Sequence, residues 1–303
     1  MIITHTIADL RAALAERGRP AFVPTMGNLH AGHIALVEQA RPLGDVTVAS
    51  IFVNRLQFLP HEDFDSYPRT WDSDCAQLAA AGCDVLFAPR EADLYPAPQT
   101  FKVHPDPALA DILEGHFRPG FFTGVCTVVM KLFSAVFFGA TGSGTSTGSG
   151  GTGAAVFGKK DYQQLMVIQR MVDQFALPVR VVAGETRRAD DGLALSSRNG
   201  YLNTDERARA VELSRVLRDL AGAVRGRAGD GDGASGSALA RLPDHEARAC
   251  RALQGLGWQP DYLTVRQRHD LQPPLTADAL AGPLVALGAA RLGGTRLIDN
   301  LEF

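Results

Sequence analysis

Residues 19–53 decide the fold and read RPAFVPTMGNLHAGHIALVEQARPLGDVTVASIFV. Residues 19–25 form a brief apolar run that predicts a strand, 31–40 have helical propensity, and 45–53 are β-branched and almost wholly apolar. A strand that is apolar at every position suits a parallel sheet buried on both faces. The order strand, helix, strand therefore predicts an α/β fold.

The alternation of strands and helices continues along the chain. Thr6 and Asp9 resemble a capping box that starts a short N-terminal helix. The further predicted elements are helix 71–81, strand 84–88, strand 154–158, helix 161–175, strand 179–183, helices 204–220 and 243–256, and strands 262–265 and 283–289. We expect a Rossmann-like parallel-sheet domain, residues 1–184, followed by a smaller α+β domain, residues 185–303.

Two stretches of small residues interrupt this pattern. Residues 140–153 contain only Ala, Gly, Ser and Thr, which bury little surface and lose much backbone entropy when they become ordered. We predict a mobile loop there. The Gly-rich residues 222–236 are predicted to link the two helices on either side of them.

Composition narrows the classes of protein to consider. The chain has 303 residues and a formal net charge of −3, so no excess of basic charge favours nucleic acid as a partner. The apolar residues 125–138 include Lys131 and fall short of the roughly 18 residues of a membrane span. The N-terminus lacks a secretory pattern, and the four cysteines form no C-x-x-C pair. We expect a cytoplasmic protein with reduced thiols.

The densest group of chemically active residues is the turn from the first strand to the first long helix, residues 24–33 (PTMGNLHAGH). His30 and His33 are spaced i and i+3, and Gly27 permits close backbone approach. Two imidazoles at a helix N-terminus favour an anion, such as a phosphate in transfer. The alternative is that one His caps the helix and the other packs in the core. A metal site is less favoured because no third ligand lies nearby.

Eight sequence blocks carry a further pattern: residues 24–33, 50–58, 67–70, 113–120, 124–133, 157–164, 191–199 and 291–300. In this order they resemble the pantothenate synthetase family of the nucleotidyltransferase superfamily, which carries a His-x-Gly-His motif. Because the blocks run from residue 24 to residue 300, the resemblance extends over nearly the whole chain and chance similarity is a poor explanation.

The resemblance implies an ATP-dependent ligase that joins pantoate to β-alanine in pantothenate and coenzyme A synthesis. The pantoate carboxylate attacks the α-phosphate to give pantoyl adenylate and pyrophosphate, and the β-alanine amine then displaces AMP. The resemblance also implies Mg²⁺ with ATP, a cytoplasmic homodimer, and a C-terminal domain that closes over ATP bound by the N-terminal domain.

The same resemblance assigns roles to individual residues. Gln57 and Gln164 match the glutamines that hold pantoate, and Asp74 matches an acidic position implicated in Mg²⁺ binding. The catalytic candidates are His30, His33, Lys160 and Arg198. The family often assigns proton donation to the second His, but we expect both His to stabilise charge on the transferring phosphate, because the attacking carboxylate brings no proton to remove. The ATP-binding candidates are Met26, Gly27, Asn28, Leu29, His30, Ala31, Gly32, His33, Gly158, Lys159, Lys160, Asp161, Arg187, Leu195, Ser196, Ser197 and Arg198.

Plain structural explanations exist for most of these residues. Each glutamine could be a solvated surface amide, and Lys160 with Asp161 an exposed ion pair. The segment from Ser196 to Arg198 could be a turn with a helix cap, and this reading is compatible with phosphate binding.

Three residues depart from the family pattern near the candidate site. Arg55 replaces Pro, Phe121 replaces His, and Lys159 replaces Glu, while residues 140–153 lengthen a short Pro-Asp turn. A longer loop adds little closure cost, and none of these changes removes a catalytic candidate.

Two other functions compete with this reading. An adenylyltransferase could join AMP to a phosphate-bearing acceptor, although Gln57 and Gln164 suit a small hydroxy acid better. A non-catalytic nucleotide-binding protein would bind ATP without turnover, as the three departures would allow.

Overall fold

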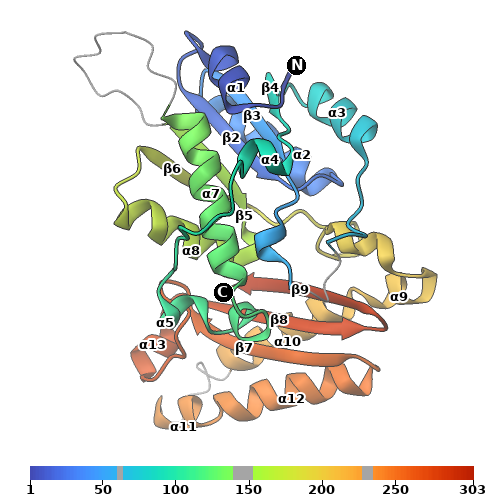
Figure 1. Cartoon of the computed structure of the whole chain (residues 1–303). Coiled ribbons are helices and arrows are strands. Elements are labelled where there is room, and N and C mark those ends of the chain that lie inside the picture. Colours follow the sequence, from blue (N-terminus) through green and yellow to red (C-terminus); the bar gives the residue numbers. More distant parts are fainter. Residues whose placement is uncertain (60–63, 139–152, 227–234) are drawn as a thin grey trace. The chain divides into compact units, whose positions relative to one another are not determined.

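The computed structural model describes residues 1–59, 64–138, 153–226 and 235–303 (Figure 1). It forms two compact units. The first comprises Met1–Lys159 and Gln163–Thr186, and the second Lys160–Tyr162 and Arg187–Phe303. The predicted loop at 140–153 lies outside the described residues except for Gly153, and residues 227–234 of the predicted link lie outside them as well.

The first unit contains a six-stranded sheet in the order β1-β4-β3-β2-β5-β6, parallel throughout. This confirms the predicted parallel α/β fold. The strands are β1 (Ile2–Thr4), β2 (Pro20–Thr25), β3 (Val46–Ile51), β4 (Val85–Phe87), β5 (Gly153–Gly158) and β6 (Val179–Gly184). Of these six strands, only β1 has no counterpart in the prediction.

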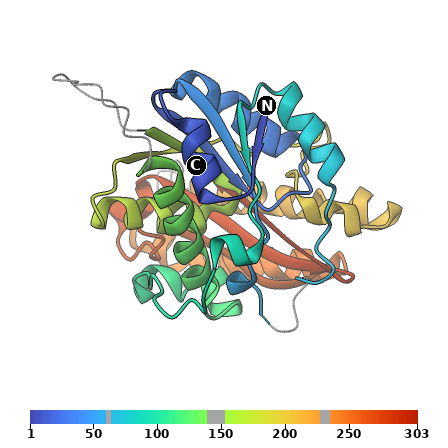
Figure 2. The ribbon, with the colours of Figure 1, turned by 45° about the horizontal axis from the view of Figure 1, so that its top comes forward.

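Helices cover both faces of this sheet, with α2 beside α3 and α1 beside α7 (Figures 1 and 2). Thr6 caps α1 by accepting a hydrogen bond from the Asp9 N–H, as predicted. The long helices are α1 (Ile7–Leu14), α2 (Ala31–Ala40), α3 (Trp71–Ala80), α7 (Phe121–Phe137) and α8 (Tyr162–Gln174). The short ones are α4 (Glu91–Leu94), α5 (Pro107–Ala110) and α6 (Glu114–Phe117).

Helix α7 is the most apolar helix of the first unit and lies against the sheet. In the part of the chain that the structure describes, no helix is both long and apolar enough to cross a membrane. Phe133 of α7 is fully buried and makes edge contacts with Phe22, Phe137 and Phe157. This aromatic cluster joins α7 to strands β2 and β5, whose ends carry the candidate site.

The second unit is built on an antiparallel sheet in the order β7-β8-β9, from β7 (Gln259–Gln267), β8 (Leu284–Leu292) and β9 (Thr295–Glu302). Strands β8 and β9 form a hairpin in which Leu292 pairs with Thr295 around Gly293 and Gly294. Gly293 has a φ of +56°, which suits a two-residue hairpin turn. Strand β9 was missed in the sequence because residues 291–300 were read only as a motif.

The predicted helix 204–220 is wrong as a single element. The structure has α9 (Thr204–Arg209) followed by α10 (Glu212–Arg225). Ala210 and Val211 keep helical φ values, but ψ values of −24° and −17° interrupt the α-helical pattern. Both side chains are buried. The helical spacing of apolar residues therefore continues across the break, and the sequence pattern does not reveal that two helices are present. The remaining helices are α11 (Ser235–Ala240), α12 (Leu242–Gly255) and α13 (Ala277–Ala281).

All four cysteines are free thiols in the structure. Burial raises the pKa of Cys83 to about 11 and that of Cys126 to about 12. Both thiols therefore stay protonated, and unreactive as nucleophiles, at neutral pH.

Replacing Phe133 by Ala tests the aromatic cluster. We expect the free energy of unfolding to fall by about 3–5 kcal/mol, because truncating a buried Phe removes apolar contacts and leaves a cavity. Urea unfolding measures the loss. Phe138→Ala is the matched control, since that ring is 47% exposed; an equal loss in both variants would contradict the role given to the cluster.

Candidate active site

The turn between β2 and α2 is held by a buried carboxylate. Gly27 and Asn28 have φ values of +83° and +50°, and these left-handed residues aim successive N–H groups at one point. The Asp74 carboxylate, 1% exposed, accepts hydrogen bonds there from Asn28 N at 2.9 Å and Leu29 N at 2.8 Å. Thr70 Oγ1 donates a third at 3.0 Å.

Gly27 is required at its position by backbone conformation and by space. A Cβ there would approach the Asp74 carboxylate and the Ile51 side chain, both at 3.1 Å. The close approach that Gly27 permits here is that of a protein side chain, and approach of a ligand stays a prediction. The close neighbour is a carboxylate, so the Asn28 and Leu29 N–H groups are already used by the protein.

His30 and His33 form a reciprocal cap at the start of α2. The Gly32 N–H donates to His30 Nδ1 at 3.1 Å, and the His30 N–H donates to His33 Nδ1 at 3.3 Å. His30 therefore caps the helix, one of the roles considered from the sequence. The two half-buried rings lie 4.0 Å apart between centroids.

These two hydrogen bonds decide the protonation pattern of both rings. A ring nitrogen that accepts an N–H bond carries no proton, so in each neutral imidazole the proton lies on Nε2. The donor group of each neutral ring is therefore Nε2–H.

Gln57 is positioned by neighbours that the sequence did not single out. It lies on a short 3₁₀ helix, Arg55–Gln57. Asn54, 1% exposed, donates to Gln57 Oε1 at 3.2 Å and accepts from the Tyr95 hydroxyl at 3.0 Å. Gln57 Nε2 donates to the Met26 sulfur at 3.1 Å. The structure thus brings together the predicted pantoate residue Gln57 and the predicted ATP residue Met26.

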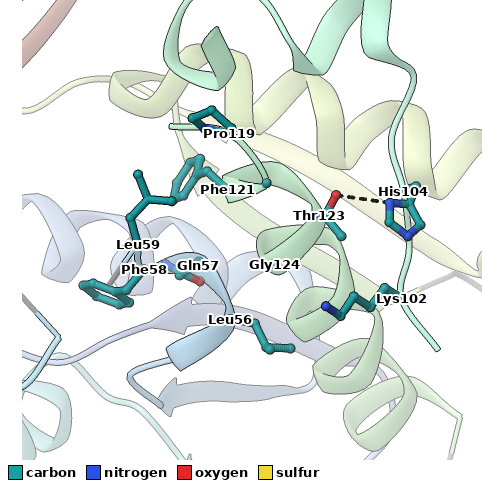
Figure 3. Close-up of a pocket in the computed structure, with 11 residues that line it drawn as sticks. Leu56, Gln57, Phe58, Leu59, Lys102, His104, Pro119, Phe121, Thr123 and Gly124 are labelled. Carbon is teal, nitrogen blue, oxygen red and sulfur yellow. Dashed lines mark hydrogen bonds between the residues drawn. The ribbon is translucent and has the colours of Figure 1, made fainter. Parts of the chain in front are cut away.

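Two cavities lie beside these residues in the first unit. One, of about 420 Å³, is lined by residues that include Gly27, Trp71 and Asp74. The other, of about 500 Å³, lies between the Gln57 segment and the start of α7 (Figure 3). Lys102 and His104 line its far side.

The remaining candidates of the first unit lie on β5 and α8. Gly158 ends β5, Lys159 follows it, and Gln164 is half-buried on α8. Neighbouring Gln163 is 4% exposed, and its side chain bonds the Leu109 and Ile112 carbonyls at 2.7 and 2.8 Å. Of these adjacent glutamines, Gln163 therefore has a structural task.

The other candidates belong to the second unit: Lys160, Asp161, Arg187, Leu195, Ser196, Ser197 and Arg198. The Leu195 N–H donates to the Arg187 carbonyl at 2.9 Å. Ser196 caps the short helix Ser197–Tyr201 by accepting from the Arg198 N–H at 3.3 Å. The predicted turn and cap are present, and phosphate binding by this segment stays a prediction.

The three departures from the family pattern each have a partner in the structure. Arg55 stacks over the Phe64 ring at 3.8 Å, and Arg118 stacks over Phe121 at the same distance. Arg118 also donates to the Gln57 carbonyl at 3.1 Å. Lys159 pairs with Glu185 at 2.6 Å, so its extra charge has a counter-ion.

The contacts of Asp74 favour an anchoring task over Mg²⁺ binding. Three hydrogen-bond donors already surround its carboxylate, and Mg²⁺ requires oxygen ligands in near-octahedral geometry. Among the described residues, no group of three or more His, Cys, Asp and Glu side chains could hold a metal ion. The role of Asp74 as a metal ligand stays a prediction.

Comparisons with known proteins agree over the whole chain. A family model described as pantoate-beta-alanine ligase matches residues 2–302. The chain is 71% identical to a pantothenate synthetase from Paracidovorax citrulli (strain AAC00-1) and 66% identical to one from Verminephrobacter eiseniae (strain EF01-2), each over the full length of both chains.

Solved structures show the same likeness. Pantothenate synthetase from Thermus thermophilus has 42% identity and a TM-score of 0.83, with 99% of each chain covered. A pantoate-beta-alanine ligase from Francisella tularensis, described as complexed with beta-gamma ATP and beta-alanine, has 30% identity and a TM-score of 0.74. That match covers 99% of this chain and 97% of the other.

Asp74→Asn tests the anchoring task. The amide keeps the size of the side chain but loses an acceptor, which leaves a buried N–H unpaired. We expect the free energy of unfolding to fall by about 1–3 kcal/mol and ATP affinity to fall by about tenfold. Urea unfolding and ATP titration measure these changes.

The exposed Asp72, in the first turn of the same helix, supplies the control Asp72→Asn. Unchanged stability of Asp74→Asn, together with a lost Mg²⁺ dependence of ATP binding, would instead assign Asp74 to the ion.

Proposed function

Because the chain belongs to the pantoate-beta-alanine ligase family, we propose that it joins pantoate to β-alanine at the expense of ATP, through a pantoyl-adenylate intermediate. Pyrophosphate leaves in the first step and AMP in the second. The contacts of His30 and His33 support this proposal, because a neutral imidazole whose Nδ1 accepts a backbone N–H carries its proton on Nε2, and such an N–H group can donate to a phosphate oxygen.

In the first step, a pantoate carboxylate oxygen forms a bond to the α-phosphorus of ATP. The bond from that phosphorus to the bridging oxygen breaks, and pyrophosphate leaves with the electron pair. The attacking carboxylate has no proton to lose, so this step needs no base. It needs stabilisation of charge on the α-phosphate oxygens.

His30 and His33 suit that task as neutral donors. With Nδ1 occupied as an acceptor in each ring, the Nε2–H group can hydrogen-bond a phosphate oxygen. Releasing that proton would leave an imidazolate, which is a poor product at neutral pH. The geometry therefore favours electrostatic stabilisation over proton donation for both residues.

The other candidates are given roles that suit their chemistry. We propose that Lys160 and Arg198 neutralise the phosphates, and that Ser196 and Ser197 bind the departing pyrophosphate. Gln57 and Gln164 hold the hydroxyls and carboxylate of pantoate. ATP enters as its Mg²⁺ complex, in which phosphate oxygens and water supply most ligands.

In the second step, the β-alanine nitrogen attacks the acyl carbon of the adenylate. The new C–N bond forms, the C–O bond to AMP breaks, and the nitrogen loses a proton. We propose that residues 1–184 bind ATP and pantoate, and that residues 185–303 close over the adenylate and exclude water that would hydrolyse it.

The first test is pantoate-dependent exchange of labelled pyrophosphate into ATP, with Mg²⁺ present and β-alanine omitted. We expect exchange that requires pantoate, followed by AMP release when β-alanine is added. His33→Ala should reduce exchange by about 10²–10³-fold, the usual loss when one charge-stabilising donor is removed.

His269→Ala is the control, because its side chain is 72% exposed. Exchange driven only by phosphate-bearing acceptors would favour an adenylyltransferase. ATP binding without any exchange would favour a non-catalytic nucleotide-binding protein.

We also propose that the protein is a cytoplasmic homodimer, as the family resemblance implies. Phe101, 89% exposed, is a large apolar side chain that a second copy could cover. Sedimentation velocity is expected to give twice the mass of one chain at micromolar concentration, and Phe101→Ser to shift the equilibrium toward monomer. A monomer at all concentrations would contradict this proposal.

A further inference from the structure

Residues 160–162 are part of the second unit, although the residues on both sides of them are part of the first. Lys160–Tyr162 belongs to the second unit, whereas Lys159 and Gln163 belong to the first. The candidate catalytic residue Lys160 therefore belongs to the unit that contains the C-terminal part of the chain. The boundary expected at residue 184 places it instead in the N-terminal domain.

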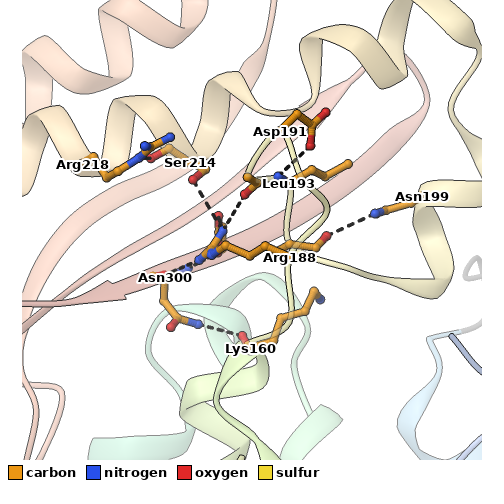
Figure 4. A network of polar contacts seen from close by, with 11 residues as sticks. Lys160, Arg188, Asp191, Leu193, Asn199, Ser214, Arg218 and Asn300 are labelled. Atoms are coloured by element: carbon orange, nitrogen blue, oxygen red, sulfur yellow. Dashed lines mark hydrogen bonds and ion pairs between the residues drawn. The ribbon is translucent and has the colours of Figure 1, made fainter. Parts of the chain in front are cut away.

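The attachment is made by β9. Asn300, 7% exposed, donates from Nδ2 to the Lys160 carbonyl at 2.9 Å (Figure 4). The Tyr162 hydroxyl donates to Glu302 Oε1 at 2.8 Å. Alternate residues of a strand point to one side, so Asn300 and Glu302 can together hold residues 160 and 162.

Asp299, the residue before Asn300 in β9, holds the segment that leads into the candidates Ser196, Ser197 and Arg198. Asp299, whose side chain is 5% exposed, forms a two-pronged ion pair with Arg188, both contacts at 2.8 Å. Arg188 also donates to the Asn300 carbonyl at 3.1 Å. Arg188 belongs to the turn that leads into Ser196 and Arg198, and Figure 4 shows its side chain together with Ser214 and Asn300, to which it also donates.

Strand β9 thus holds the Lys160 backbone and the Arg188 guanidinium within one unit. A lysine ammonium sits on a flexible four-carbon stem, so its reach is fixed only where its backbone is fixed. The Asn300 amide supplies that fixed point from a position 140 residues away in sequence.

We propose that Asn300 is a positioning residue for Lys160, acting through the Lys160 backbone carbonyl, and that Glu302 supports it through Tyr162. The catalytic part of this inference rests on the proposed function. Small displacements of a catalytic group are expected to lower kcat more than they weaken substrate binding.

Asn300→Leu removes the donor at similar size and tests the proposal. We expect kcat for pantoate-dependent pyrophosphate exchange to fall at least tenfold, with a smaller change in the KM for pantoate. The matched control is Thr264→Val on β7, which removes a buried 2.8 Å hydrogen bond to Glu246 in the same unit. It should leave kcat within twofold.

A double-mutant cycle separates positioning from general damage. If Asn300 acts through Lys160, Asn300→Leu should cause almost no further loss in a Lys160→Ala background. A full tenfold loss in that background, or an equal loss in Thr264→Val, would overturn the proposal.

A second measurement does not depend on turnover. The chain has only four lysines, so competitive acetylation read by mass spectrometry can follow Lys160 against the exposed Lys102. Asn300→Leu should change the relative rate of Lys160 at least twofold, and Thr264→Val should not. An unchanged rate would overturn the proposal.

Tyr162→Phe serves if Asn300→Leu does not fold, because it removes the other attachment to β9 with little change in shape. The same change in Lys160 labelling is expected, and an unchanged rate would again overturn the proposal. If the wild-type protein shows no exchange, the proposed function fails while the labelling result still decides the positioning inference.

Discussion

The buried carboxylate of Asp74 is the constraint on which the candidate site depends. A carboxylate taken out of water is tolerated only when hydrogen bonds replace its hydration, and here two backbone N–H groups and a hydroxyl do so. The same bonds hold Gly27 and Asn28 in left-handed conformations that would otherwise be costly for Asn28. Helix α2 therefore begins at a defined place beside the ends of β2 and β3, and with it the two histidines.

Structural and chemical tasks coincide in His30 and His33. The capping bonds that start α2 use Nδ1 of each ring, and this assigns the proton of each neutral ring to Nε2, the atom that we propose donates to a phosphate. Capping is often treated as a competing explanation for a histidine in this position. Here it supplies the tautomer and orientation that the proposed chemistry requires.

The two units hold their candidate polar groups in different ways. In the first unit, the candidates are fixed by a helix start and by a chain of hydrogen bonds from the Tyr95 hydroxyl through the Asn54 amide to Gln57. In the second, adjacent residues of an edge strand bind two separate segments, Asp299 through an ion pair and Asn300 through one hydrogen bond. A cation on a long side chain gains precision from such backbone attachment, because its own stem provides little.

The sequence by itself determined the parallel α/β class, the bounds of α2, the cap at Thr6 and the family, since these rest on local periodicity, local turn chemistry and ordered motifs. It also selected Gln57, His30, His33 and Lys160 as candidates. Only the tertiary structure decided that Asp74 anchors a turn, that Asn54 holds Gln57, and that Lys160 belongs with β9. Each of these contacts joins residues that are close in space but carry no joint pattern in the sequence: Asn54 and Gln57 lie in one turn with no periodic signal, Asp74 and Asn28 are 46 positions apart, and Asn300 and Lys160 are 140 apart.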